Sequence, residues 1–120
     1  MRPSPPLSLP RQLILKNRRS FRRLYKEGKR LRNGPLLLFY RISSHRPFRV
    51  GFSTGKQFTK AVSRNRARRL MREAFRLRQR DVQEGIDYIF VWVGSIEGVT
   101  MSQVERRLSE LLHKGGLLKT

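Results

Sequence analysis

The chain has no cysteine, two histidines, and eight Asp and Glu residues against 28 Lys and Arg. Without cysteine it can form neither a disulfide nor a thiolate metal site. A protein ribonuclease needs a His–His or His–Lys pair or clustered carboxylates; His45 and His113, the latter beside Lys114, are more typical of surface residues than of catalysts, and the carboxylates form no close metal-binding motif. We therefore expect no catalytic residue and no metal site in the protein itself.

Long hydrophobic runs are also missing, which argues against a membrane protein. No apolar run approaches the ~20 residues that a membrane-spanning helix requires. Prolines recur through residues 1–10, where a secretory signal would need a continuous apolar stretch. We expect a cytoplasmic protein with a Pro-rich, flexible segment at 1–12 and a single folded domain at 13–120.

The excess of positive charge is the dominant feature of the composition. The formal net charge is +20, and such a field favours association with a polyanion. The candidates are nucleic acid, an anionic membrane and an acidic protein. Most of the basic residues are arginines, whose planar guanidinium groups bind phosphate through paired hydrogen bonds and stack on bases. The composition therefore favours nucleic acid.

Hydrophobic periodicity and capping residues predict an alternation of helices and strands. We expect a helix from the N-cap Asn17 to Glu27, strands at 36–42 and 48–54, a helix from about 61 to 79, a buried central strand at 88–93, and a last helix ending at Gly115. The first two strands are expected to form an antiparallel pair. The last helix begins at a capping box, either Thr100 with Gln103 or Ser102 with Glu105.

The helix expected after residue 61 separates charged from apolar residues. At about 100° per residue, one face, which we call the arginine face, presents Arg64, Asn65, Arg68, Arg69, Arg72 and Arg76. The opposite face gathers Ala67, Leu70, Met71, Ala74 and Leu77, with Phe75 and Arg78 at its borders.

Two other interpretations of this helix are weaker. A solvated helix usually pairs arginine with glutamate four residues away, and Glu73 is almost alone on this helix. A helix lying on a membrane would place large apolar residues beside its basic face, whereas Ala67 and Ala74 suit packing on a core. The arginine face is therefore predicted to meet successive RNA phosphates.

Aromatic side chains are concentrated on the first predicted helix and the first two strands, and such rings can stack on the bases of single-stranded RNA. Most of them must nevertheless belong to the core. Alternation places Leu37 and Phe39 on one face of their strand and Tyr40 on the other, and it leaves open which face is buried.

Several of these segments together resemble the bacterial ribonuclease P protein family. The resemblance rests on Arg49–Ser53, on Lys56 and on Lys60–Phe75 with its Arg-Asn-Arg sequence at 64–66, and it extends over about residues 13–114. It implies an α+β fold: a two-layer α/β sandwich in which helices pack on a small four-stranded mixed sheet, as in some ribosomal proteins. It also implies an unusual left-handed strand–helix–strand crossover through the arginine-rich helix.

The resemblance further implies a function. The chain would be the protein component of a ribonucleoprotein endoribonuclease whose catalysis lies in the RNA subunit. It would bind that catalytic RNA and the 5′ leader of precursor tRNA, and it would assist removal of the leader. Mg²⁺ would be the cofactor, held mainly by the RNA and the substrate, and neither a membrane nor a protein partner is expected. A ribosomal or other structural RNA-binding protein is the alternative.

Site residues follow by position. Contact with the catalytic RNA is expected at Arg64, Asn65, Arg66, Arg68, Arg69 and Arg72, to which the arginine face adds Arg76. The cleft for the leader is expected to be lined by Phe21, Tyr25, Leu37, Phe39, Ser53 and Lys56.

Overall fold

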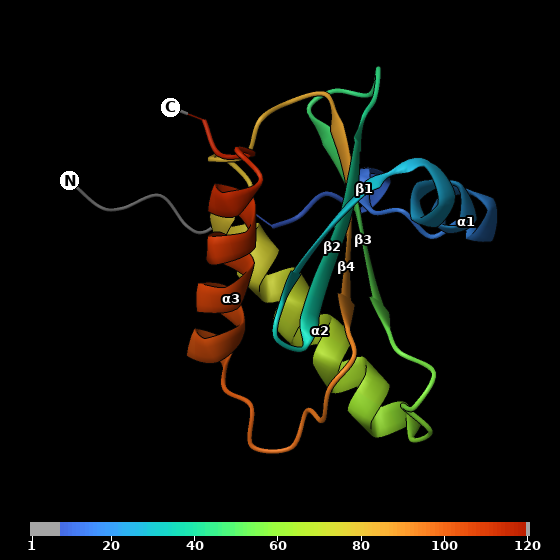
Figure 1. The fold of residues 1–120 in the computed structure, drawn as a ribbon, viewed down its shortest axis with the longest axis vertical. Coiled ribbons are helices and arrows are strands. Elements are labelled where there is room, and N and C mark those ends of the chain that lie inside the picture. The colour runs from blue at the N-terminus through green and yellow to red at the C-terminus, as the bar shows by residue number, and fades with distance from the viewer. Residues whose placement is uncertain (1–7, 120) are drawn as a thin grey trace.

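A computed structural model describes residues 8–119 of the chain. In chain order the elements are a 3-10 helix η1 (Arg11–Leu13), α1 (Arg18–Glu27), β1 (Lys29–Asn33), β2 (Leu36–Ile42), β3 (Phe48–Thr54), α2 (Ala61–Arg78), β4 (Ile86–Trp92) and α3 (Met101–Lys114). The strands form one sheet in the order β1-β2-β4-β3. Figure 1 shows α2 and α3 on one side of this sheet and α1 on the other.

The predicted fold class is confirmed: a four-stranded mixed sheet carries three α-helices. β4 runs antiparallel to β2 and parallel to β3. The parallel pair is connected through α2, which is the predicted strand–helix–strand unit. The left-handed sense of this crossover stays a prediction.

The predicted pairing of the strands at 36–42 and 48–54 is wrong, because β4 lies between them. All seven residues of β4 are buried, so this strand needs neighbours on both edges and cover on both faces. β1 was not predicted from periodicity. It holds a single apolar residue, Leu31, and it pairs only with β2, as suits the charged edge of a sheet.

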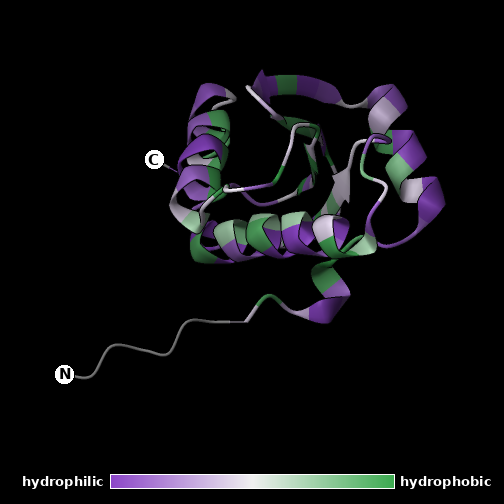
Figure 2. Ribbon diagram, turned by 90° about the horizontal axis from the view of Figure 1, so that it is seen from below, coloured by the Kyte–Doolittle hydropathy of each residue, from purple (hydrophilic) through white to green (hydrophobic). Residues whose placement is uncertain are grey.

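The main core lies between the sheet and the pair α2 and α3, and the hydropathy colouring of Figure 2 shows green stretches on the elements that enclose it. The apolar face predicted for α2 is correct at Ala67, Met71 and Ala74, which are fully buried. It is wrong at Leu77, which is 47% exposed, whereas Phe75 is fully buried. The Phe75 ring is 5.2 Å from that of Phe48, so α2 is turned toward β3 and its apolar face is displaced by part of a turn.

Two predicted helix caps are confirmed. The Asn17 side chain accepts a hydrogen bond of 2.7 Å from the backbone N–H of Arg19. Thr100 and Gln103, rather than Ser102 and Glu105, form the capping box of α3. No helix in the described part of the chain is long and apolar enough to cross a membrane.

The segment before α1 packs on the domain. Leu9, inside the segment predicted to be flexible, packs against the main core, and residues 1–7 of that segment lie outside the described residues. Ile14 forms a parallel bridge to Val50, and the Leu15 N–H donates to the Val50 carbonyl, so residues 14 and 15 cover the outer edge of β3.

Helix α1 crosses the second face of the sheet above one row of residues, Phe39, Ile89 and Gly51, which are neighbours in the strand register. Phe21 reaches the sheet at Gly51, where an added Cβ would lie 2.5 Å from the Phe21 ring. At the other end of the row, the Tyr25 ring lies 4.8 Å from that of Phe39. Because α1 lies across the strands, it divides this face of the sheet into two ends.

We expect Gly51→Ala to destabilise the fold by about 1–3 kcal/mol, because the new methyl group must push Phe21 and α1 away from the sheet. Urea denaturation measures the loss. In a Phe21→Leu background, where the clashing ring atoms are absent, the same substitution should cost clearly less. An equal cost in both backgrounds would contradict this account of the helix position.

Candidate nucleic-acid interface

The arginine face of α2 lies on the outside of the fold. Asn65, Arg68, Arg69 and Arg72 are exposed, and Arg64 is partly buried. The face points away from the main core because Ala67, Met71 and Ala74 hold the opposite side of the helix against it. Spacings of three and four residues place successive guanidinium groups about one helical turn apart, a repeat suited to a chain of phosphates.

At both ends of the arginine face, the arginine side chains are held by contacts with other groups of the chain. Arg64 donates a 3.2 Å hydrogen bond to the carbonyl of Phe58, in the turn before α2. Arg76 forms a salt bridge with Glu73, and the hydrogen bond from Arg76 lowers the pKa of the Glu73 carboxyl below its ordinary value. Among the predicted contacts, the central arginines are therefore the most available to a ligand.

Arg66 points elsewhere. Its guanidinium donates to the backbone carbonyls of Ile96 and Val99 at 2.6 and 2.8 Å, and both acceptors lie in the loop between β4 and α3. These two charge-assisted hydrogen bonds hold that loop against α2. The structure thus gives Arg66 a folding role that the sequence did not indicate, and it separates this side chain from the arginine face.

A cleft of about 560 Å³ lies where α1, β3 and α2 meet. It is lined by Ile14, Leu15, Lys16, Arg18, Phe21, Tyr25, Phe52, Ser53, Arg68 and Arg72. Three residues predicted for the leader cleft are therefore brought together with two from the arginine face. Apolar and aromatic walls meet a cationic rim in one concave surface, which is the composition expected of a single-strand binding site.

Tyr25 forms one wall of this cleft. Ser53 lines the cleft beside it, and Tyr25 is 40% exposed. Burial of the phenol raises the pKa of Tyr25 above its ordinary value, and the nearby Ser53 hydroxyl acts in the opposite direction. The phenol is therefore neutral at physiological pH and keeps both donor and acceptor capacity.

The remaining predicted cleft residues are less central. Phe39 contacts the ring of Tyr25. Leu37 lies in the next row of the sheet, where Val91 separates it from Ser53. Lys56 is exposed in the turn after β3 and does not line the cleft.

A second hollow, of about 380 Å³, extends the cleft along α2. The two hollows share Ile14, Lys16 and Arg72, so they form one groove between α2 and the segment before α1. Lys16 and Arg11 line this groove and were not predicted. No periodic pattern marks them, because they become neighbours of α2 only when residues 14 and 15 pair with β3.

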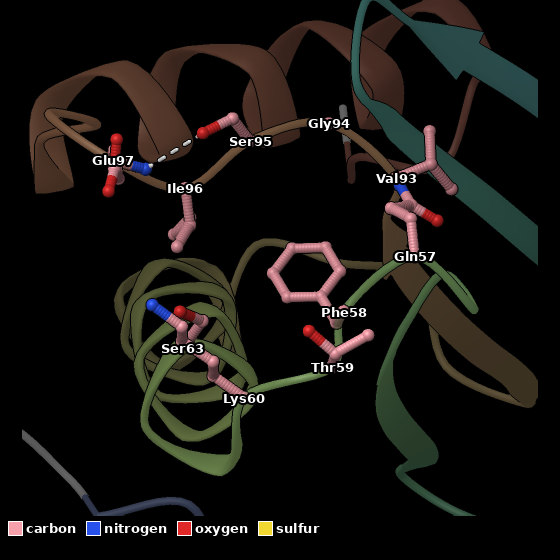
Figure 3. Close-up of a pocket in the computed structure, with 10 residues that line it drawn as sticks. All are labelled: Gln57, Phe58, Thr59, Lys60, Ser63, Val93, Gly94, Ser95, Ile96 and Glu97. Carbon is pink, nitrogen blue, oxygen red and sulfur yellow. Dashed lines mark hydrogen bonds between the residues drawn. The ribbon is translucent and has the colours of Figure 1, made fainter.

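A further hollow of about 330 Å³ lies at the start of α2 (Figure 3). Phe58 and Ile96 face each other across it, with Lys60 and Ser63 from the beginning of the helix. None of the predicted site residues lines it.

The described residues offer no group of three or more His, Asp or Glu side chains that could hold a metal ion. Several carboxylates, such as Glu73 and Asp87, form salt bridges with arginines. The side chains that the structure describes therefore do not fit a protein-held magnesium site.

Known proteins are similar to this chain over most of its length. The sequence model of a family described as Ribonuclease P matches residues 9–116. The Ribonuclease P protein component of Oceanobacillus iheyensis is 31% identical over 110 residues, which cover 91% of each chain. That of Caldanaerobacter subterraneus subsp. tengcongensis is 33% identical over 100 residues, covering 83% of this chain and 86% of the relative.

Solved structures show the same fold. The RNase P protein from Thermotoga maritima superposes with a TM-score of 0.75 at 30% identity, covering 83% of this chain and 94% of that one. The Staphylococcus aureus RNase P protein gives a TM-score of 0.78 at 24% identity, covering 89% and 98% of the two chains.

We expect Arg66→Ala to lower the free energy of unfolding by about 2 kcal/mol, because two carbonyls lose charged donors. Arg69→Ala, which removes an exposed arginine from the same helix, should change it by less than about 0.5 kcal/mol. Urea denaturation of both variants without RNA makes the comparison. Equal stabilities would show that the Arg66 contacts do not support the fold.

Proposed function

This chain belongs to the ribonuclease P protein family, the protein part of a ribonucleoprotein enzyme, and from that premise we propose how it acts. It binds the catalytic RNA through the arginine face of α2. It holds the unpaired 5′ leader of precursor tRNA in the cleft beside α1, and it thereby assists endonucleolytic removal of the leader. The RNA subunit carries the chemistry.

The observation that carries this proposal is the shared position of Arg68 and Arg72. Both belong to the arginine face, and both line the cleft that contains Phe21, Tyr25 and Ser53. Two surfaces of different character therefore meet along one edge. One is convex and cationic, which suits the backbone of a structured RNA. The other is concave and partly aromatic, which suits a single strand with unstacked bases.

This arrangement assists cleavage by positioning. An RNA that lies on the arginine face and a leader that lies in the cleft are held by one rigid helix, α2, which reduces their freedom relative to each other. Each phosphate contact also releases condensed counterions, so the protein strengthens association of two polyanions that repel each other. Tyr25 offers a ring face for stacking and a neutral hydroxyl for a base edge or a phosphate.

In this proposal, magnesium would be held by the RNA and the substrate, where it would supply charge stabilisation for phosphodiester cleavage. The contribution of this chain is electrostatic. Its positive surface lowers the repulsion between the two RNA molecules, so that less magnesium is needed to bring them together.

We expect Arg68→Ala combined with Arg72→Ala to weaken binding of a transcribed bacterial ribonuclease P RNA by about 10- to 100-fold at physiological salt, because two phosphate contacts are lost. The slope of log affinity against log salt should fall by about two. Cleavage of precursor tRNA by the reconstituted enzyme at low magnesium should decline in parallel.

The matched control is Arg80→Ala with Arg106→Ala, which removes the same charge from exposed positions outside the groove. It should retain most of the affinity. If both double variants lose affinity equally, binding depends on net charge and not on the arginine face, and the proposal fails.

We expect Tyr25→Ala to weaken the binding of precursor tRNA by the reconstituted enzyme, since stacking on an aromatic ring contributes about 1–3 kcal/mol per base. Binding of mature tRNA, which has no leader, should be unchanged. Tyr25→Phe keeps the ring and should retain most of the preference for precursor. Equal losses of affinity for precursor and mature tRNA would show that the leader does not bind in the cleft.

A further inference from the structure

The second end of the sheet face divided by α1 holds a separate, polar hollow of about 570 Å³. Its floor is a row of three charged residues in strand register, with Arg41 on β2, Asp87 on β4 and Arg49 on β3. Arg23 from α1 and the loop after β2, which includes His45, complete the walls. At the cleft end, the corresponding row is Leu37, Val91 and Ser53, so the two ends of one face differ in chemistry.

One guanidinium in this hollow is fixed in place. Arg49 binds both carboxylate oxygens of Asp87, with Nε to Oδ1 at 3.0 Å and Nη2 to Oδ2 at 2.6 Å. The Asp87 residue is 6% exposed, and the Arg49 side chain is 28% exposed. Among the described residues Nη1 of Arg49 has no hydrogen-bond partner, so it remains free to donate to a ligand in the hollow.

Positive charge exceeds negative charge around this hollow. Three arginines line it, Arg23, Arg41 and Arg49, against one carboxylate, Asp87. Glu27 at the end of α1 approaches Arg23 and Arg41 at 3.4 Å each, but it is about half exposed and does not line the hollow. Even with Glu27 counted, one guanidinium charge stays unneutralised.

Stability alone is a poor explanation for these charges. A buried ion pair contributes little net stability, because desolvation offsets the attraction between the charges. A mostly uncharged row such as Leu37, Val91 and Ser53 at the cleft end would cover the sheet without these charges. The Ser44 hydroxyl adds a donor to the same hollow, whereas the Ser43 hydroxyl is hydrogen-bonded to His45. Fixed guanidinium and hydroxyl donors in a concave, electropositive site are the means by which proteins bind phosphate.

We propose that this hollow binds a backbone phosphate of RNA, at a site distinct from the cleft on the other flank of α1. The outer surface of α1 links the two sites, since Arg19 and Arg22 are exposed there. RNA that occupies both would therefore pass over α1 along a continuous basic path. The inference rests on the proposed function only for the identity of the RNA.

The first test uses inorganic phosphate and the full chain. Phosphate is titrated against chloride at constant ionic strength while ¹H–¹⁵N spectra are recorded. Saturable shifts are expected at the backbone amides of Ser43, Ser44 and His45 and at the Arg49 Nε–H. Arg23→Gln with Arg41→Gln should weaken this binding by about tenfold or more, and it leaves the Arg49–Asp87 pair intact.

Arg80→Gln with Arg106→Gln is the control with the same charge change. These exposed arginines do not line the hollow, so its phosphate affinity should stay within about twofold of the parent's. Shifts that spread evenly over the chain, or equal weakening in both double variants, would overturn the site. This arm needs no RNA, and its outcome is therefore independent of the proposed function.

The second test asks whether RNA is the occupant. The affinity of the transcribed ribonuclease P RNA, with and without precursor tRNA, is measured across a salt series. The Arg23→Gln, Arg41→Gln variant should lower the slope of log affinity against log salt by about one more than the control does. A slope equal to that of the control overturns RNA as the ligand, even where inorganic phosphate binds.

Discussion

The burial of β4 from both sides is the constraint on which the rest of this structure depends. All seven residues of the strand are buried, so a single helical layer cannot satisfy it. α2 and α3 cover one face, and α1 must cover the other. The position of α1 then creates the cleft, because a helix lying across the strands leaves part of the sheet open on each flank. The need to bury both faces of β4 therefore accounts for the cleft beside α1.

The sequence predicted the helices and their caps because these depend on local signals. Asn17 and Thr100 cap through hydrogen bonds to residues two and three positions later, and such spacing is visible without a fold. Strand order depends on contacts between distant segments. Nothing near β2 or β3 indicates that β4 lies between them. β1 was not predicted for a different reason: an edge strand rich in Lys and Arg has no alternation of apolar and polar residues.

The same division between local and distant information applies to the candidate site. The arginine face follows from helical geometry and was predictable, and so was the exposure of Arg68 and Arg72. The hydrogen-bond partners of Arg66 were not predictable, because its acceptors lie about thirty residues further along the chain, at Ile96 and Val99. Lys16 was missed because its place in the groove depends on how the segment before α1 pairs with β3. Residue type therefore identified the chemistry of the surface, and tertiary packing decided which side chains share it.

Leu15 lines both the cleft and the polar hollow, and α1 is the wall between them. A ligand that tilts this helix to widen one space must narrow the other. Occupancy at the two ends is then linked thermodynamically: whatever factor the first ligand imposes on the affinity of the second, the second imposes on the first. The close packing of Phe21 on Gly51 limits how far the helix can tilt, and it therefore limits the strength of this coupling.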